Sequence, residues 1–95
     1  MINIIDETKV MDSTIRIQIL LYLNRSSMSY TELKNECGIA DGAMTNHITK
    51  LKDAEYISAA KGYEHNRPKT TYSITDTGRA KIKQFVADLN ESLNS

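Results

Sequence analysis

A tight turn between two short helical segments is the feature that most constrains the fold of this chain. Ser29-Tyr30-Thr31-Glu32 matches a capping box, in which the serine and glutamate side chains satisfy backbone amides at the start of a helix. Gly38 is suited to end that helix, because glycine readily takes a positive φ. Only Ile39 and Ala40 separate it from Asp41, a good N-cap for another helix. Two helices joined so closely predict a helix-turn-helix.

A β-hairpin is expected after these helices. Two short β-prone runs, residues 57–61 and 70–74, flank a polar and partly basic stretch at residues 62–69. We therefore predict two strands with a long tip. Gly62 would begin the turn, and Pro68 would stiffen it by fixing φ.

Helices are expected at both ends of this core pattern. The first should begin near Asp12 or Ser13 and end before residue 24, and the last should run from a Thr75 cap to about Leu93. The order is therefore helix, helix, helix, strand, strand, helix. This is a mainly α chain with a small β-hairpin (α+β), and its 95 residues suit a single domain spanning 1–95.

The charge is balanced in sum but unevenly distributed along the chain. Twelve basic and twelve acidic residues give a formal net charge of zero, which argues against bulk coating of nucleic acid. Residues 42–85 hold eight basic and four acidic side chains, a net of +4, while residues 1–41 and 86–95 are each −2. The basic centre coincides with the third helix and the hairpin.

Other signals point to the cytoplasm. The longest apolar run is far shorter than the ~20 residues that cross a bilayer, and the start of the chain lacks the pattern of a secretory signal. A single cysteine, Cys37, cannot form an internal disulfide. It is expected to be a small core residue, with an oxidation switch as the alternative.

Five stretches, in order and at matching spacing, resemble the winged helix-turn-helix regulators of bacteria and archaea, the broad group that includes MarR-like and ArsR-like repressors. The stretches are residues 15–23, Ser29-Tyr30-Thr31-Glu32-Leu33, residues 41–51, residues 61–72 and Ile74-Thr75-Asp76-Thr77-Gly78-Arg79. The resemblance covers about four-fifths of the chain and implies that the third helix and the hairpin, or wing, bind double-stranded DNA. One departure is Glu55, where relatives usually carry glycine.

The third helix is the candidate reader of DNA bases. If it buries Met44, Ile48, Leu51 and Ala54, its small polar residues face outward, where they suit close approach to the major groove. Asn46 and Thr45 are expected at bases, and Thr49 and Lys50 near phosphate. The candidate DNA-binding residues are Tyr30, Thr31, Gly42, Ala43, Thr45, Asn46, Thr49, Lys50, His65, Asn66, Arg67 and Lys69. An ordinary solvated helix face and a basic hairpin that discourages edge aggregation are the plainer alternatives.

The last helix carries a heptad-like apolar seam. We expect this helix, residues 76–93, and the N-terminal segment, residues 1–11, to form a homodimer interface, as the resemblance also implies. The interface residues expected are Ile2, Ile5, Ile82, Phe85, Val86, Leu89 and Leu93. The alternative is that the last helix packs back on its own domain.

Catalytic and metal-binding patterns were not found in the sequence. His47, Cys37 and His65 have no ligand partner at helical spacing, and no nucleophilic triad or glycine-rich phosphate loop is present. We therefore expect no enzyme activity, no metal and no cofactor, with any small-molecule effector unidentified. The predicted function is that of a homodimeric transcriptional regulator that binds specific double-stranded DNA sites and acts as a repressor. The alternatives are a protein–protein interaction module, or a DNA-binding protein of plasmid partition or chromosome architecture.

Overall fold

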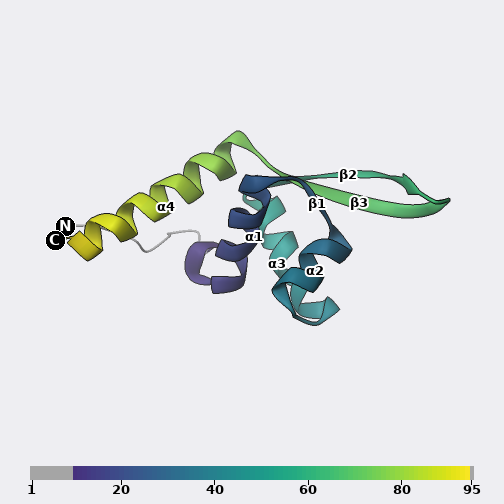
Figure 1. The fold of residues 1–95 in the computed structure, drawn as a ribbon, viewed down its shortest axis with the longest axis horizontal. Helices are drawn as coiled ribbons and strands as arrows, with labels where there is room; N and C mark the ends of the chain where they lie inside the picture. Colours follow the sequence, from purple (N-terminus) through teal and green to yellow (C-terminus); the bar gives the residue numbers. More distant parts are fainter. Residues whose placement is uncertain (1–9, 95) are drawn as a thin grey trace.

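The computed structural model describes residues 10–94 and has the predicted winged-helix architecture (Figure 1). Its elements are η1 (Val10–Asp12), α1 (Thr14–Arg25), β1 (Met28–Ser29), α2 (Tyr30–Cys37), α3 (Asp41–Asp53), β2 (Ile57–Glu64), β3 (Arg67–Ile74) and α4 (Asp76–Asn94). The mainly α fold with a small antiparallel hairpin is confirmed. The hairpin projects from one end of the elongated body and α4 from the other.

Side-chain caps define most of the helix starts. Ser13 Oγ accepts from the Arg16 amide at 3.3 Å, and Thr75 Oγ1 accepts from the Gly78 amide at 2.9 Å. At Ser29 the capping box is complete, and Gly38 ends α2 with a φ of 64°. These predictions are confirmed.

Two helix boundaries differ from expectation. Helix α1 continues through Arg25 rather than ending before residue 24, because the backbone hydrogen bonds persist to the Ser26 amide. Ala40, not Asp41, is the N-cap of α3, and it makes no side-chain cap bond. The carboxylate of Asp41 instead accepts from the Tyr30 hydroxyl at 2.9 Å and pairs with Lys34 Nζ at 3.1 Å, so it joins α3 to α2.

The hairpin is longer and its turn tighter than predicted. The strands pair out to Glu64 and Arg67, leaving only His65 and Asn66 in the turn, with φ values of 52° and 63°. Positive φ at both central residues is typical of a type I′ turn, whose twist matches that of the strands. Gly62 therefore lies inside β2, opposite Lys69, and does not begin the turn.

A third strand completes the sheet in the order β1-β3-β2. Strand β1 pairs antiparallel with β3, Met28 opposite Tyr72. Two residues are too few to show a strand periodicity, so the sequence pattern missed it. This pairing fixes the base of the wing beside the start of α2.

The core lies between the helices and the base of the sheet. Its fully buried side chains are Ile19, Leu20, Leu33, Met44, Leu51 and Ile82. Every helix from α1 to α4 contributes at least one of them, so α3 is held with its apolar face inward. Ala54, expected on that face, is the C-cap of α3 and is half-buried.

Glu55 occupies the left-handed region, with a φ of 62°. An L-residue in this conformation is strained by about 1–2 kcal/mol, whereas glycine adopts it without strain. Glycine also makes the unfolded chain more flexible, which lowers the stability of the fold by about 0.4–1 kcal/mol. We expect Glu55→Gly to raise the free energy of unfolding by about 0.5–1 kcal/mol, measured by urea denaturation. Glu55→Ala keeps the Cβ and is the control, so an equal gain in both variants would contradict the backbone explanation.

Candidate nucleic-acid interface

The outer face of α3 consists of small polar side chains above a buried apolar face. Met44, Ile48 and Leu51 are at most 4% exposed. On the opposite side, the structure exposes six of the residues expected to bind DNA: Gly42, Ala43, Thr45, Asn46, Thr49 and Lys50. The buried face thus fixes α3 on the core, and the exposed face is a helical surface of the kind that a major groove admits.

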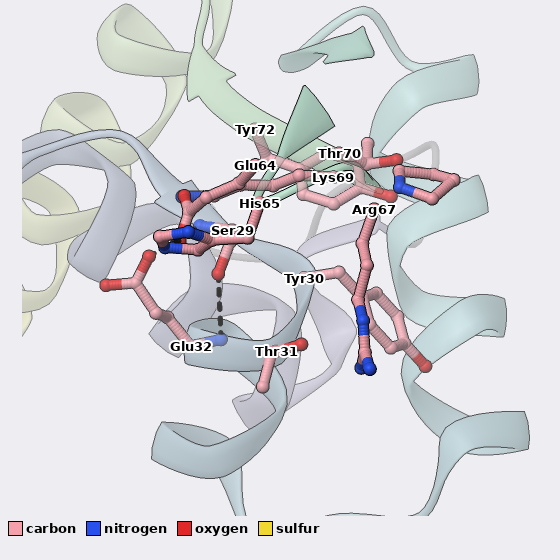
Figure 2. A pocket seen from close by; sticks show the side chains of 11 residues that line it. Ser29, Tyr30, Thr31, Glu32, Glu64, His65, Arg67, Lys69, Thr70 and Tyr72 are labelled. Carbon is pink, nitrogen blue, oxygen red and sulfur yellow. Dashed lines mark hydrogen bonds and ion pairs between the residues drawn. The ribbon is translucent and has the colours of Figure 1, made fainter. Parts of the chain in front are cut away.

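A groove lies between the wing and the start of α2 (Figure 2). Tyr30 and Thr31 line it from α2, and His65, Arg67 and Lys69 line it from the wing. In Figure 2 the Arg67 side chain points from the wing toward Tyr30. Five of the predicted residues, from segments about 35 positions apart, are thus brought together. Asn66 sits at the turn and is not among the residues that line the groove.

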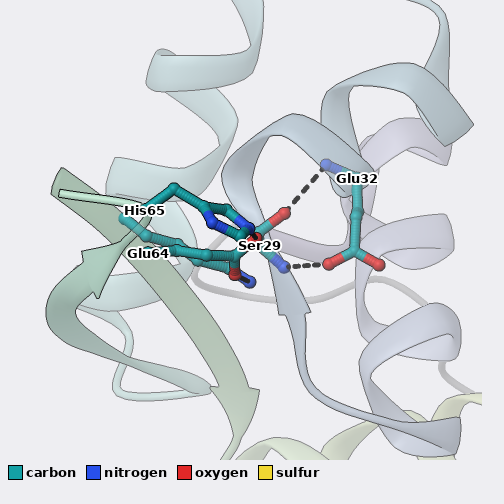
Figure 3. Close-up of polar contacts among 5 residues, drawn as sticks. Ser29, Glu32, Glu64 and His65 are labelled. Carbon is teal, nitrogen blue, oxygen red and sulfur yellow. Dashed lines mark hydrogen bonds and ion pairs between the residues drawn. The ribbon is translucent and has the colours of Figure 1, made fainter. Parts of the chain in front are cut away.

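The start of α2 has limited capacity to bind an anion. The capping box engages the amides of Ser29 and Glu32 (Figure 3), which leaves at most those of Tyr30 and Thr31 to donate. Hydrogen bonds from Ser29 lower the pKa of the Glu32 carboxyl, so an anion persists beside the groove. A phosphate here would need a cation from the wing to offset that charge.

Lys69 and Arg67 are the lysine and the arginine of the wing that line the groove, and they differ in whether a carboxylate pairs with them. Lys69 is paired with Glu64 across the hairpin, and this pairing raises the pKa of Lys69. His65 Nε2 lies 4.0 Å from Glu64 Oε1 (Figure 3), so the carboxylate is close to both Lys69 and His65. Within residues 10–94, Arg67 forms no ion pair. Arg67 is therefore the more available phosphate ligand of the two.

One polar contact behind the interface was not anticipated. Arg16, only 6% exposed, is within 2.9 Å of His47 Nδ1 through Nη1 and donates to the Val10 carbonyl at 2.6 Å through Nε. An arginine in the apolar run Ile15-Arg16-Ile17 was the only available signal. Its partner lies 31 residues away, so local spacing could not identify the contact.

The residues expected at a dimer interface fall into three groups. Ile82 is 2% exposed and belongs to the core of its own chain, so it has no free surface for a partner, and Phe85 is half-buried against that core. Val86, Leu89 and Leu93 are 40%, 36% and 82% exposed. Ile2 and Ile5 lie outside the described residues. Of the residues expected at the interface, those that the structure shows as exposed therefore lie on the outer half of α4.

The described residues offer little support for a redox or metal site. Cys37 is half-buried, and burial raises the pKa of its thiol, which disfavours the reactive thiolate. Residues 10–94 contain no group of three potential metal ligands. None of the helices described is long and apolar enough to span a membrane.

Comparison with known families gives a match over most of the chain. Residues 15–93 match the model of a winged helix DNA-binding domain. An uncharacterized protein of Methanocaldococcus jannaschii, MJ0432, is 29% identical over an alignment of 84 residues, and the match covers 85% of this chain and 89% of that protein.

Solved structures show the same fold. A transcriptional regulator homologue from Pyrococcus horikoshii superposes with a TM-score of 0.75 at 24% identity, covering 90% of this chain and 91% of that one. ZitR of Lactococcus lactis, a zinc-responsive MarR family member, gives a TM-score of 0.68 at 20% identity, with 86% of this chain and 56% of ZitR covered. A ZitR variant has been solved in complex with DNA.

Proposed function

Because the chain belongs to the winged helix DNA-binding domain family, we propose that it is a single-domain cytoplasmic regulator that binds specific double-stranded DNA sites as a homodimer and represses transcription by occluding promoters. The observation that carries the proposal is the exposed polar face of α3, backed by a fully buried apolar face. In this proposal Asn46 and Thr45 contact bases, while Thr49, Lys50 and Arg67 contact phosphate.

Salt dependence of binding tests this function. Fluorescence anisotropy with a random duplex at two salt concentrations should show affinity that falls steeply as salt rises, because phosphate contacts release counterions. Selection of bound sequences from a random pool should then yield a site with two half-sites about one helical turn apart. No binding at either salt would instead favour a protein–protein interaction module, and binding without an enriched site would favour an architectural role.

Glu64 is expected to restrain nonspecific binding, because it neutralises Lys69 at the wing. We predict that Glu64→Gln raises affinity for random duplex by about twofold to fivefold at low salt and steepens the salt dependence, since one more lysine can contact phosphate. Glu36→Gln, which removes an exposed carboxylate near the end of α2, is the control. Equal effects from both variants would show that only total charge matters.

Dimerisation is proposed through the outer half of α4, where Val86, Leu89 and Leu93 are exposed. Sedimentation should give a dimer at micromolar concentration. Leu89→Glu should shift it to monomer, because a carboxylate would be buried between two chains, whereas Asn90→Glu on the neighbouring exposed position should not. A monomeric wild-type protein at micromolar concentration would rule out the homodimer.

A further inference from the structure

One buried guanidinium connects three elements that are separate in sequence. Arg16 lies on α1, its Nε donates to the Val10 carbonyl of η1 at 2.6 Å, and its Nη1 is 2.9 Å from His47 Nδ1 on α3. Val10 and Met11 are themselves buried, so η1 is a fixed point of the core. The contact therefore ties the inner edge of α3 to the body of the domain.

The chemistry of this contact requires a neutral histidine. Arginine has only N–H donors, so His47 Nδ1 must accept and the ring proton must be on Nε2. Protonation of His47 would place a donor against a donor and a cation against a cation. The charged groups that act on His47 within residues 10–94 are Arg16 from α1 and Lys50 from the next turn of α3. Burial first, and then both cations, hold the pKa of His47 below its ordinary 6.5.

The position of His47 gives this contact a functional consequence. It follows Thr45 and Asn46 directly on α3, on the half-buried edge of the helix that exposes them. A shift of α3 at His47 would therefore displace the side chains proposed to reach bases. Phosphate contacts from the wing lie on a different element and would be less affected.

We propose that Arg16 is a positioning residue that aligns the recognition helix through neutral His47, so that discrimination of the specific DNA site weakens when His47 is protonated. This inference rests on the proposed function of α3. It concerns discrimination rather than total affinity, because a protonated His47 also adds a positive charge that would strengthen binding to any DNA at low pH. The two effects have opposite signs, so the ratio of specific to random affinity separates them.

The direction of the stability effect follows from the lowered pKa. A histidine that is harder to protonate in the folded state stabilises the fold fully above its unfolded pKa, and this contribution is lost as pH falls through the folded value. The melting temperature should therefore decrease below about pH 6.5. His47→Asn places an amide oxygen near the position of Nδ1 and cannot titrate, so it should remove this part of the pH dependence.

The test compares wild type, His47→Asn and Arg16→Lys between pH 7.5 and 5.5. The ratio of affinities for a selected site and random duplex should fall by about threefold to tenfold in wild type as pH drops, and remain nearly constant in His47→Asn. Arg16→Lys keeps the positive charge but replaces the two nitrogens that contact Val10 and His47 with a single one. The ratio of specific to random affinity of this variant should therefore already be low at pH 7.5. His65 is present in all three proteins, so its ionisation cancels in the comparison.

The outcomes separate this inference from the proposed function. Identical pH profiles of the affinity ratio in wild type and His47→Asn would overturn the positioning role. Absence of DNA binding at every pH would overturn the proposed function and, with it, the inference. In that case a melting temperature that depends on His47 below pH 6.5 would still establish the Arg16–His47 contact as part of the fold.

Discussion

Gly78→Ala should destabilise the protein by about 3 kcal/mol or more, enough to unfold much of a marginally stable domain. A Cβ at Gly78 would lie 2.0 Å from the Tyr56 carbonyl oxygen and 2.8 Å from its carbon. Both atoms belong to backbone, so no side-chain rotation relieves the overlap. The start of α4 would have to move away from the base of the wing.

Two hydrogen bonds join the start of α4 to the segment before β2 and oppose such a movement. The Thr75 amide donates to the Tyr56 carbonyl at 3.0 Å, and Thr75 Oγ1 donates to the Glu55 carbonyl at 2.6 Å. The same hydroxyl accepts from the Gly78 amide at 2.9 Å. Separation of α4 would break the two bonds to Tyr56 and Glu55 and also withdraw Ile82 from the core.

Gly42→Ala is the matched control for this variant. Gly42 lies in the first turn of α3, as Gly78 does in α4, but an added Cβ meets nothing within 4 Å. Alanine there should leave stability unchanged or raise it by up to about 1 kcal/mol, because it has the higher helix propensity. Urea denaturation of both variants measures the difference. Equal stability of the two would show that α4 can shift without loss of packing.

Local sequence signals predicted the elements whose determinants are local. The caps at Ser29 and Thr75 and the glycine at Gly38 each act within four residues, and all three are confirmed. The tight hairpin was missed because its turn residues, His65 and Asn66, take positive φ without a glycine. Strand β1 was missed because it exists only through pairing with β3.

The candidate interface was likewise predictable only where its determinants are local in sequence. Helical periodicity was enough to place Asn46 on an exposed face and Ile48 on a buried one, and the structure agrees. Periodicity carries no information on pairs that are distant in sequence. The Arg16–His47 contact therefore required the folded structure. The folded structure was also needed to assign Ile82 to the core of its own chain, because an apolar residue in the seam of α4 can pack either on that core or on a partner.

Asn46→Ala and Arg67→Ala should weaken DNA binding in different ways. Asn46 is exposed on α3, where its amide can bond both the N6 and N7 positions of adenine, so its loss should cost about 1–3 kcal/mol at a selected site. Random duplex offers no matching base, so binding to it should change little. The ratio of the two affinities should therefore decrease.

Arg67 should contribute through phosphate instead. It lines the groove beside Tyr30 and forms no ion pair within residues 10–94, so its charge is available to DNA of any sequence. Arg67→Ala should weaken binding to the selected site and to random duplex alike, and reduce the slope of log affinity against log salt by about 1. The affinity ratio should stay close to that of wild type.

Anisotropy titrations of both DNAs at several salt concentrations distinguish these effects. Asn35→Ala, an exposed asparagine on α2 that does not line the groove, is the control for loss of an amide. If Asn46→Ala weakened both DNAs equally, α3 would contact backbone rather than bases. If Arg67→Ala left the salt slope unchanged, the wing would not contact phosphate. Because the two variants have opposite signatures in ratio and slope, they test the two parts of the interface independently.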